Sequence, residues 1–213
     1  MNVAALQALS DPAVLAGLRA KGLSPADISK HIDKVRLYFS RKNASAFAAY
    51  ILKDEESGKP VMQAPAHQVW HELLDKHSRM VVLAHVDSGK TQQLSISRPL
   101  FELGRRPQLR VVIVSATAKQ AGKIAGTIKR YIESSADLHA VFPQLQPGSP
   151  WTGDTFSIKE QPPHVKDPSV QVVGMFGHIL GARIDLLVLD DVLDFENTRT
   201  EYQRQKAYDW IKS

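Results

Sequence analysis

Four short apolar segments lie between residues 80 and 189, at 80–84, 110–114, 170–175 and 186–189. Apolar residues predominate in each, mostly at consecutive positions, which is typical of strands buried on both faces of a sheet. Helical patterns alternate with these segments, as expected where helices connect parallel strands. The pattern predicts an α/β core with a mostly parallel sheet flanked by helices. A weaker pattern predicts one short strand at 155–158, within otherwise irregular surface structure at 143–168.

Helical periodicity dominates much of the remaining chain. Residues 121–132 carry apolar side chains every three or four positions, so this segment should pack on the sheet as a helix. Before the charged linker at 55–60 the chain reads as wholly helical, with Ser24 and Pro25 as one of its N-terminal signals. We therefore expect a small helical N-terminal subdomain at 1–58 and a core at 59–213. Further helices are expected at 67–76, at 90–104 with an interruption at Pro99, and at 196–211.

The first apolar segment leads into a loop with the composition of a phosphate-binding turn. It fits the pattern G-x-x-x-x-G-K-[ST] except at the first position, where alanine replaces glycine. In such loops, backbone N–H groups point at phosphate oxygens, the lysine reaches the β and γ phosphates, and the hydroxyl ligates Mg²⁺. The alternative is an ordinary surface turn. The predicted nucleotide-binding residues are Ala84, His85, Val86, Asp87, Ser88, Gly89, Lys90 and Thr91.

The last apolar segment ends in two adjacent carboxylates, Asp190 and Asp191. Ligands of open α/β sheets bind at the carboxyl ends of the strands, where these side chains should lie. We expect Asp190 to hold Mg²⁺ and Asp191 to orient and deprotonate an attacking water. The alternative is that the pair caps the next helix. Together, the loop and the acidic pair predict a site that binds and hydrolyses ATP or GTP.

Composition narrows the classes of protein further. The chain has 213 residues, is 43% hydrophobic and contains no cysteine, which excludes disulfides, thiolate zinc sites and cysteine nucleophiles. No stretch approaches the length of a membrane span, and the first residues do not resemble a signal peptide. The net charge is +5, and residues 90–130 hold nine bases against the single acid Glu102. Such a segment could face a polyanion or form a solvated basic surface.

Two families share parts of these patterns. The loop at 84–91 resembles the phosphate loop of translational GTPases, but the Asn-Lys-x-Asp and Asp-x-x-Gly strings of that family do not occur. From His67 to Trp210 the order of motifs resembles the ATPase domain of large terminase subunits, the DNA-packaging motors of tailed bacteriophages and related viruses. The segments that carry this resemblance are Pro65, His67 and Trp70 before the loop, the strand and Ser-Ala-Thr at 111–117, Trp151-Thr152, the stretch 174–191 with both carboxylates, and Asp209-Trp210.

The resemblance implies a P-loop NTPase fold of the RecA-like, additional-strand catalytic-glutamate type. It implies ATP and Mg²⁺ as ligands, with phosphate and metal contacts from Lys90 and Thr91. Asp190 matches the metal aspartate and Asp191 the catalytic carboxylate. Gln68 or His67 matches the adenine-contacting position. A trans-acting arginine would come from Arg105, Arg106 or Arg110.

The resemblance also implies a soluble ATPase in the host cytoplasm, which translocates double-stranded DNA into a procapsid. The implied partners are double-stranded DNA, the portal protein and the small terminase subunit, with a homo-oligomeric ring as the assembled form and no membrane association. A coupling segment and a nuclease domain would follow Ser213. A helicase or remodelling ATPase, or a non-catalytic nucleotide-binding assembly module, remains an alternative.

Overall fold

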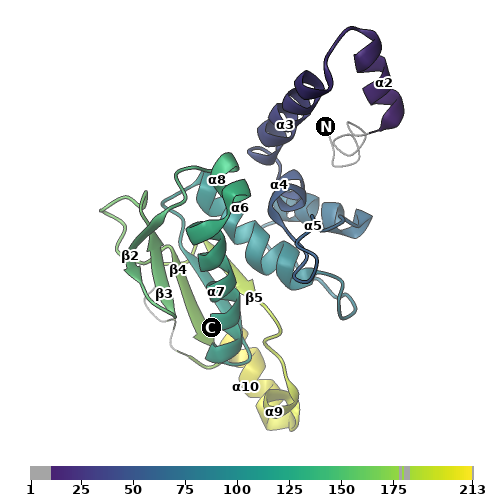
Figure 1. The fold of residues 1–213 in the computed structure, drawn as a ribbon. Helices are drawn as coiled ribbons and strands as arrows, with labels where there is room; N and C mark the ends of the chain where they lie inside the picture. The colour runs from purple at the N-terminus through teal and green to yellow at the C-terminus, as the bar shows by residue number, and fades with distance from the viewer. Residues whose placement is uncertain (1–10, 178, 180–182, 213) are drawn as a thin grey trace. The chain divides into compact units, whose positions relative to one another are not determined.

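The computed structural model describes residues 11–177, 179 and 183–212 (Figure 1). It divides into two compact units, each described here by itself. The first comprises Met1–Ser88 with Ala136–Pro143, and the second comprises Gly89–Ser135 with Gln144–Ser213. No helix among the described residues is both long and apolar enough to cross a bilayer.

The first unit is built of helices, and it includes residues 59–88 and 136–143 in addition to the segment 1–58 expected to form a helical subdomain. Asp11, Ser24 and Asn43 accept hydrogen bonds from the first turns of the helices that follow them, which explains where α2, α3 and α4 begin. The helices are α2 (Pro12–Ala20), α3 (Pro25–Ser40), α4 (Ala44–Ile51), α5 (Pro65–Lys76) and α8 (Ala136–Val141).

The core of this unit joins α4 to a distant part of the chain. Phe47 is fully buried and its ring lies 5.4 Å from that of Phe142. Arg41 donates hydrogen bonds to the carbonyls of Ala140 and Val141, at 3.1 Å and 2.9 Å. Residues 136–143 are therefore held in this unit by both apolar packing and hydrogen bonds.

The second unit contains a five-stranded sheet in the order β2-β3-β4-β1-β5. Two pairings, β1 with β4 and β1 with β5, are parallel, and the other two are antiparallel. The prediction of a mostly parallel sheet is therefore correct for one half of this sheet and wrong for the other. The strands are β1 (Val111–Ser115), β2 (Pro147–Trp151), β3 (Thr155–Ile158), β4 (Val170–Gly174) and β5 (Leu186–Leu189).

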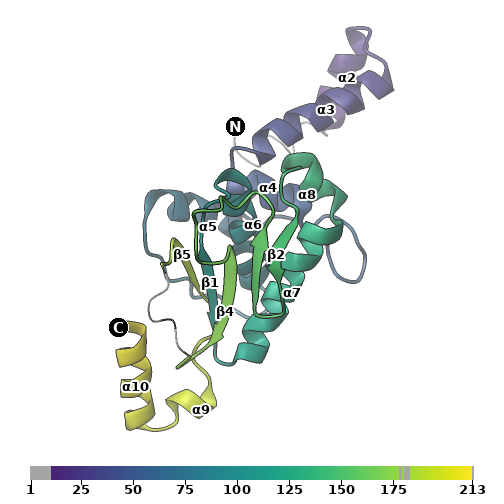
Figure 2. The same cartoon turned by 90° about the vertical axis from the view of Figure 1, so that its left-hand side faces the viewer.

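Helix α7 (Ala118–Ser134) and a side chain of the C-terminal helix pack on the parallel part of the sheet. The buried face of α7 packs on β1 and β4, beside which it runs in Figure 2. On the other side, Val112, Val114 and Val173 form a cluster against which Trp210 packs. This arrangement explains why every residue of β1 is buried. The remaining helices are η1 (Thr91–Ser97, a π-helix), α6 (Arg98–Arg105), α9 (Phe195–Thr198) and α10 (Glu201–Lys212).

The predicted strand at 80–84 is absent, which corrects the sequence analysis. Residues 81–84 form no ladder with any described strand, and Val81 and Leu83 are 85% and 93% exposed. An apolar run becomes a strand only when a neighbouring strand accepts its backbone hydrogen bonds. The composition of this segment is typical of a strand, but the described residues provide it with no partner.

Three smaller expectations were only partly correct. β2 was missed because prolines at 147 and 150 argue against a strand, although they are tolerated at the edge of a sheet, where β2 lies. The helix expected at 90–104 is present but is not interrupted at Pro99, since the backbone stays helical and changes from the π-helix η1 to α6 at Arg98, with Pro99 in the first turn of α6. The helix expected at 196–211 divides into α9 and α10, because Thr200 and Gln203 form a reciprocal cap.

Alanine substitutions at two glycines should change the stability of the protein in opposite directions. Gly174 contacts α7, and Gly126 lies within it. A Cβ at Gly174 would lie 2.6 Å from the backbone nitrogen of Ala118, whereas a Cβ at Gly126 would meet no atom within 4 Å. We expect Gly174→Ala to lower the free energy of unfolding by roughly 1–3 kcal/mol. Gly126→Ala should raise it by about 0.5–1 kcal/mol. Urea unfolding of both variants measures this difference, and equal shifts would contradict the close packing of β4 on α7.

Candidate nucleotide site at the carboxyl edge of the sheet

The parallel pairing of β1 with β5 brings Asp190 and Asp191 to the carboxyl end of β1. The register pairs Val114 with Leu189. The ladder continues beyond it, because Asp190 N–H donates to the carbonyl of Val114 at 2.9 Å and Ala116 N–H donates to the carbonyl of Asp191 at 3.2 Å. Both acidic residues are thus anchored through their backbones.

Two hydroxyls from η1 donate to the carboxylate of Asp190. Thr91 Oγ1 lies 3.3 Å from Oδ1 and 3.2 Å from Oδ2, and Ser95 Oγ lies 3.0 Å from Oδ1. Thr91 and Ser95 are separated by four residues, close to one turn of a π-helix, so their side chains project from the same face. The structure therefore brings together residues that are about a hundred positions apart in the sequence.

The environment of Asp190 disfavours its charge. Burial raises the pKa of the Asp190 carboxyl above its ordinary value, and the negative charge of Asp191 acts in the same direction. The hydrogen bonds from Ser95 and Thr91 and the positive charge of Lys90 oppose this rise without cancelling it. A cation close to Asp190 would relieve this unfavourable charge.

Gly89, Lys90 and Thr91 form the turn that starts η1. Gly89 has φ of 78°, a left-handed conformation that glycine adopts without a Cβ clash, and its carbonyl accepts from Gln93 N–H at 2.9 Å. Lys90 precedes the first residue of the π-helix. The glycine required by the loop pattern therefore stands where the backbone needs it.

Asp191 is exposed and has φ of 44°, which is uncommon for a residue with a side chain. Such conformations persist where the surrounding structure holds them, and they gather at functional sites. Here the Ala116 N–H bond to the Asp191 carbonyl holds the backbone on one side. On the other, Asn197 Nδ2 donates to the carbonyl of Val192 at 2.8 Å.

The oxygen atoms of Thr91 and Asp190 suit a hard cation. Mg²⁺ prefers oxygen ligands and is usually held by one or two protein groups, with substrate phosphates and waters filling the other positions. A hydroxyl within 3.3 Å of a carboxylate of raised pKa fits this description. Thr91 and Asp190 are the residues that would hold the ion.

The other predicted site residues belong to the first unit, because the division falls between Ser88 and Gly89. Residues 84–88 form a turn in which Asp87 has φ of 61° and His85 Nδ1 lies 2.5 Å from the carbonyl of Val86. Ala84, in the position where the pattern has glycine, is partly buried.

A buried histidine contacts the end of this turn. His67 Nε2 lies 2.9 Å from the carbonyl of Ser88, and His67 Nδ1 accepts from Ala64 N–H at 3.3 Å. The second bond identifies Nε2 as the protonated nitrogen, so Nε2 donates to Ser88. Of the two residues proposed to contact adenine, His67 thus has both ring nitrogens engaged. The other, Gln68, donates to Glu72 on its own helix at 2.7 Å.

Sequence reasoning missed Ser95 and the contact between His67 and Ser88. A hydroxyl residue four positions after Thr91, on a segment expected to be helical, was the available signal for Ser95. The contact of His67 joins residues 21 positions apart through a backbone carbonyl, and no residue pattern reveals such a bond.

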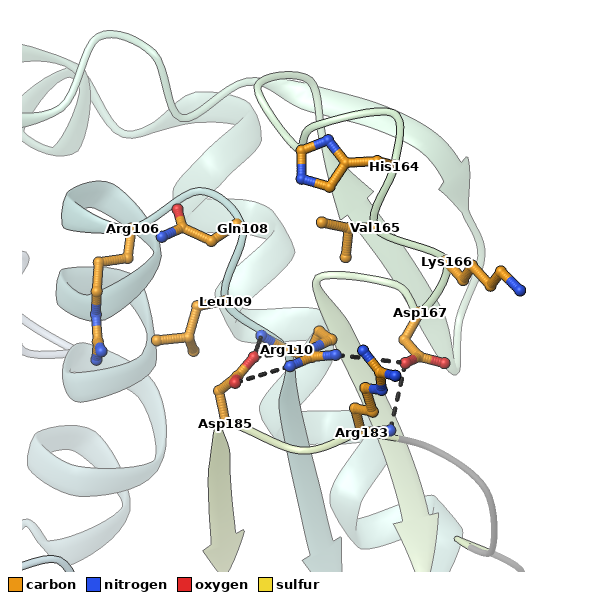
Figure 3. Close-up of a pocket in the computed structure, with 10 residues that line it drawn as sticks. All are labelled: Arg106, Gln108, Leu109, Arg110, His164, Val165, Lys166, Asp167, Arg183 and Asp185. Carbon is orange, nitrogen blue, oxygen red and sulfur yellow. Dashed lines mark hydrogen bonds and ion pairs between the residues drawn. The ribbon is translucent and has the colours of Figure 1, made fainter.

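The arginines considered for a trans-acting role have partners within this chain. Arg110 forms two hydrogen bonds with Asp185, at 2.7 Å and 2.9 Å, and lies 3.8 Å from Asp167. These contacts line a pocket of about 540 Å³ where β1 and β5 begin, opposite the edge that carries Asp190 (Figure 3). Arg106 pairs with Glu102 at 2.6 Å, and the Arg105 guanidinium lies 5.3 Å from the centre of the Phe101 ring.

Comparison with known proteins agrees with the resemblance found in the motifs. No protein-family model matches the chain. Over 115 residues the chain is 33% identical to the terminase large subunit of Enterobacteria phage T3. The similar region covers 53% of this chain and 19% of the phage T3 protein, so the chain spans about a fifth of that relative.

We expect Asp190→Asn to stabilise the ligand-free protein. The asparagine oxygen can still accept from Ser95 and Thr91, and the unfavourable buried charge is removed. The gain should remain below about 1 kcal/mol, because solvent screens a partly exposed carboxylate. Urea unfolding at neutral pH measures it, and a clear loss of stability in Asp190→Asn would contradict this account.

The same gain should depend on pH. The pKa of Asp190 is raised above the value of 3.8, so the folded state binds more protons than the unfolded state between 3.8 and the raised pKa. The cost of the charge is therefore complete above the folded pKa and disappears below 3.8. The difference in stability between the variant and the wild type should shrink as the pH falls through this window.

Proposed function

We propose that this chain is the ATP-hydrolysing part of a phage terminase large subunit, which uses ATP to translocate double-stranded DNA into a procapsid. The convergence of Thr91 and Ser95 on Asp190, beside Lys90, is the observation that carries the proposal. It places the hydroxyl of the phosphate-loop pattern against the first carboxylate of the acidic pair. The similarity to the phage T3 terminase large subunit supports the assignment to terminases, and with it double-stranded DNA as the polymer.

Each residue has a separate role in this proposal. Lys90 neutralises charge on the β and γ phosphates, and Asp191 positions the attacking water and accepts its proton. Thr91 and Asp190 would hold Mg²⁺, which would supply positive charge to stabilise the negative charge of the phosphates. Ser95 keeps the Asp190 carboxylate oriented toward Thr91. Phosphoryl transfer needs positioning and charge more than covalent help, so these few groups suffice for slow hydrolysis.

His67 orients the backbone at the end of the loop. Its hydrogen bond fixes the carbonyl of Ser88, the residue that immediately precedes Gly89 in the sequence. A fixed carbonyl limits the orientations of the next peptide unit, whose N–H is among those expected to face phosphate. We therefore assign His67 a positioning role on the loop, and contact of Gln68 or His67 with adenine stays a prediction.

Nucleotide binding and turnover by the isolated chain test the proposal. We expect Mg²⁺-dependent ATP binding and slow hydrolysis, since an arginine from a neighbouring subunit can contribute about 10³-fold or more in related enzymes. Lys90→Ala should weaken ATP binding at least about tenfold, the loss of a charge-assisted contact. Asp191→Asn should keep binding and reduce the rate by about 10²-fold or more, the usual size of a general-base contribution. Equilibrium titration and phosphate release measure these effects.

Lys159→Ala is the matched control, because Lys159 is an exposed lysine of the second unit outside the site. It should behave like the wild type in both measurements. If Lys90→Ala and the wild type bind ATP equally, the assignment of the loop is wrong. Tight Mg²⁺-dependent binding without any turnover would favour the non-catalytic assembly module instead.

A further inference from the structure

The basic segment at 90–130 separates into two groups once its partners are known. Arg98 and Arg106 pair with Glu102, and Arg110 pairs with Asp185. Lys90 lies close enough to Asp190 to influence its pKa. Four of the five bases before α7 therefore have a carboxylate near them. The other four bases of the segment are on α7.

Three of the bases on α7 share its solvent face. Lys119, Lys123 and Arg130 are exposed, and among the described residues none of them forms an ion pair. They are four and seven residues apart, or about one and two helical turns, so they form one row opposite the buried residues. The first two lie about 6 Å apart along the helix axis.

The acid of α7, Glu133, and its remaining base, Lys129, both contact the β2–β3 hairpin. Glu133 accepts from the indole N–H of Trp151 at 2.5 Å. Lys129 donates to the carbonyl of Thr152 at 3.1 Å and lies 5.1 Å from the centre of the Trp151 ring. The row of three bases therefore faces solvent, and the acid of this helix, Glu133, is three residues from Arg130 and is engaged by Trp151.

Two glycines lie beside this row. Gly122 and Gly126 have no atom within 4 Å of the position that a Cβ would occupy. Side chains would fit at both positions, so packing within the chain does not require glycine there. Their absence leaves the helix backbone open beside the row of bases, where a bulky polyanion could approach closely.

The start of α7 is joined to the candidate nucleotide site. Thr117 caps the helix and directly follows Ala116, the first residue after β1, whose N–H donates to the carbonyl of Asp191. Gly174, at the end of β4, presses against Ala118. A change at the edge that carries Asp191 can therefore reach α7 through a short, packed path.

We propose that the outer face of α7 binds the phosphate backbone of double-stranded DNA, through Lys119, Lys123 and Arg130. The charge of the row is complementary to phosphate, and contacts from lysine and arginine to phosphate carry no sequence information, so the contact is independent of sequence. This inference deepens the proposed function, on which the identity of the polymer rests.

The test is the salt dependence of duplex binding by the whole chain. The probe is a labelled DNA duplex of mixed sequence, and the variant carries Lys119→Gln, Lys123→Gln and Arg130→Gln together. Each phosphate contact contributes about 0.9 to the slope of log K against log salt concentration, so the slope should fall by about 2.7. At about 0.1 M salt the affinity should drop on the order of 10²-fold or more.

A second triple variant removes the same charge elsewhere on the second unit. Lys159→Gln, Lys166→Gln and Arg183→Gln change exposed bases, two of them at the pocket of Figure 3, and this variant should keep the wild-type slope. Equal effects of the two triple variants, or a larger effect of the second, would overturn the proposal. Gly122→Leu and Gly126→Leu should weaken binding without changing the slope, because these substitutions add bulk and no charge.

ATP binding, measured on the same samples, separates this inference from the proposed function. The α7 triple variant should bind Mg²⁺-ATP like the wild type, because its substitutions are on the solvent face of the helix. If the wild type binds ATP but no duplex, the DNA surface is wrong while the nucleotide site stands. If duplex binding depends on α7 but ATP does not bind, the proposed function fails and the surface stands.

Discussion

The in-register parallel pairing of β1 with β5 is the constraint on which the rest of the candidate site depends. It carries Asp190 and Asp191 to the carboxyl end of β1, where backbone hydrogen bonds hold both residues. Only in this register do the hydroxyls of Thr91 and Ser95 reach the carboxylate of Asp190. A slip of one residue would turn Asp190 to the opposite face of the sheet. The apolar packing on both faces of β1 therefore determines the chemistry at its end.

The paired strands β1 and β5 hold Asp190 in an environment that disfavours the charge of its carboxylate. Burial raises the pKa of Asp190, and the hydroxyl donors only partly compensate. A protein keeps such a group where its charge serves a ligand, and here the oxygen donors suit Mg²⁺. The same edge touches the first turn of α7 through Gly174, so the site and the basic helix face share one packed support. A shift of this edge on nucleotide binding would therefore be transmitted to α7 and to DNA bound on its outer face.

Much of this could be predicted from residue patterns, and the failures have physical causes. The strands near 111–115, 170–174 and 186–189 follow from buried apolar runs, and α7 follows from its periodicity. The run at 80–84 has the same composition, but strand formation needs a partner that composition does not reveal. Strand β2 was missed because it contains two prolines, which are rare within strands. The motifs indicated Thr91 and Asp190, whereas Ser95 and the His67 bond to Ser88 depend on side-chain geometry that emerges only on folding.

A double-mutant cycle between Thr91 and Asp190 tests the central claim most directly, with calorimetric titration of Mg²⁺-ATP as the measurement. The account predicts that Thr91→Val and Asp190→Asn each weaken binding at least about tenfold, and that the double variant binds little worse than either, because both residues serve one ion. Wild-type affinity in either single variant, or losses that simply add, would contradict a shared cation site at the end of β5.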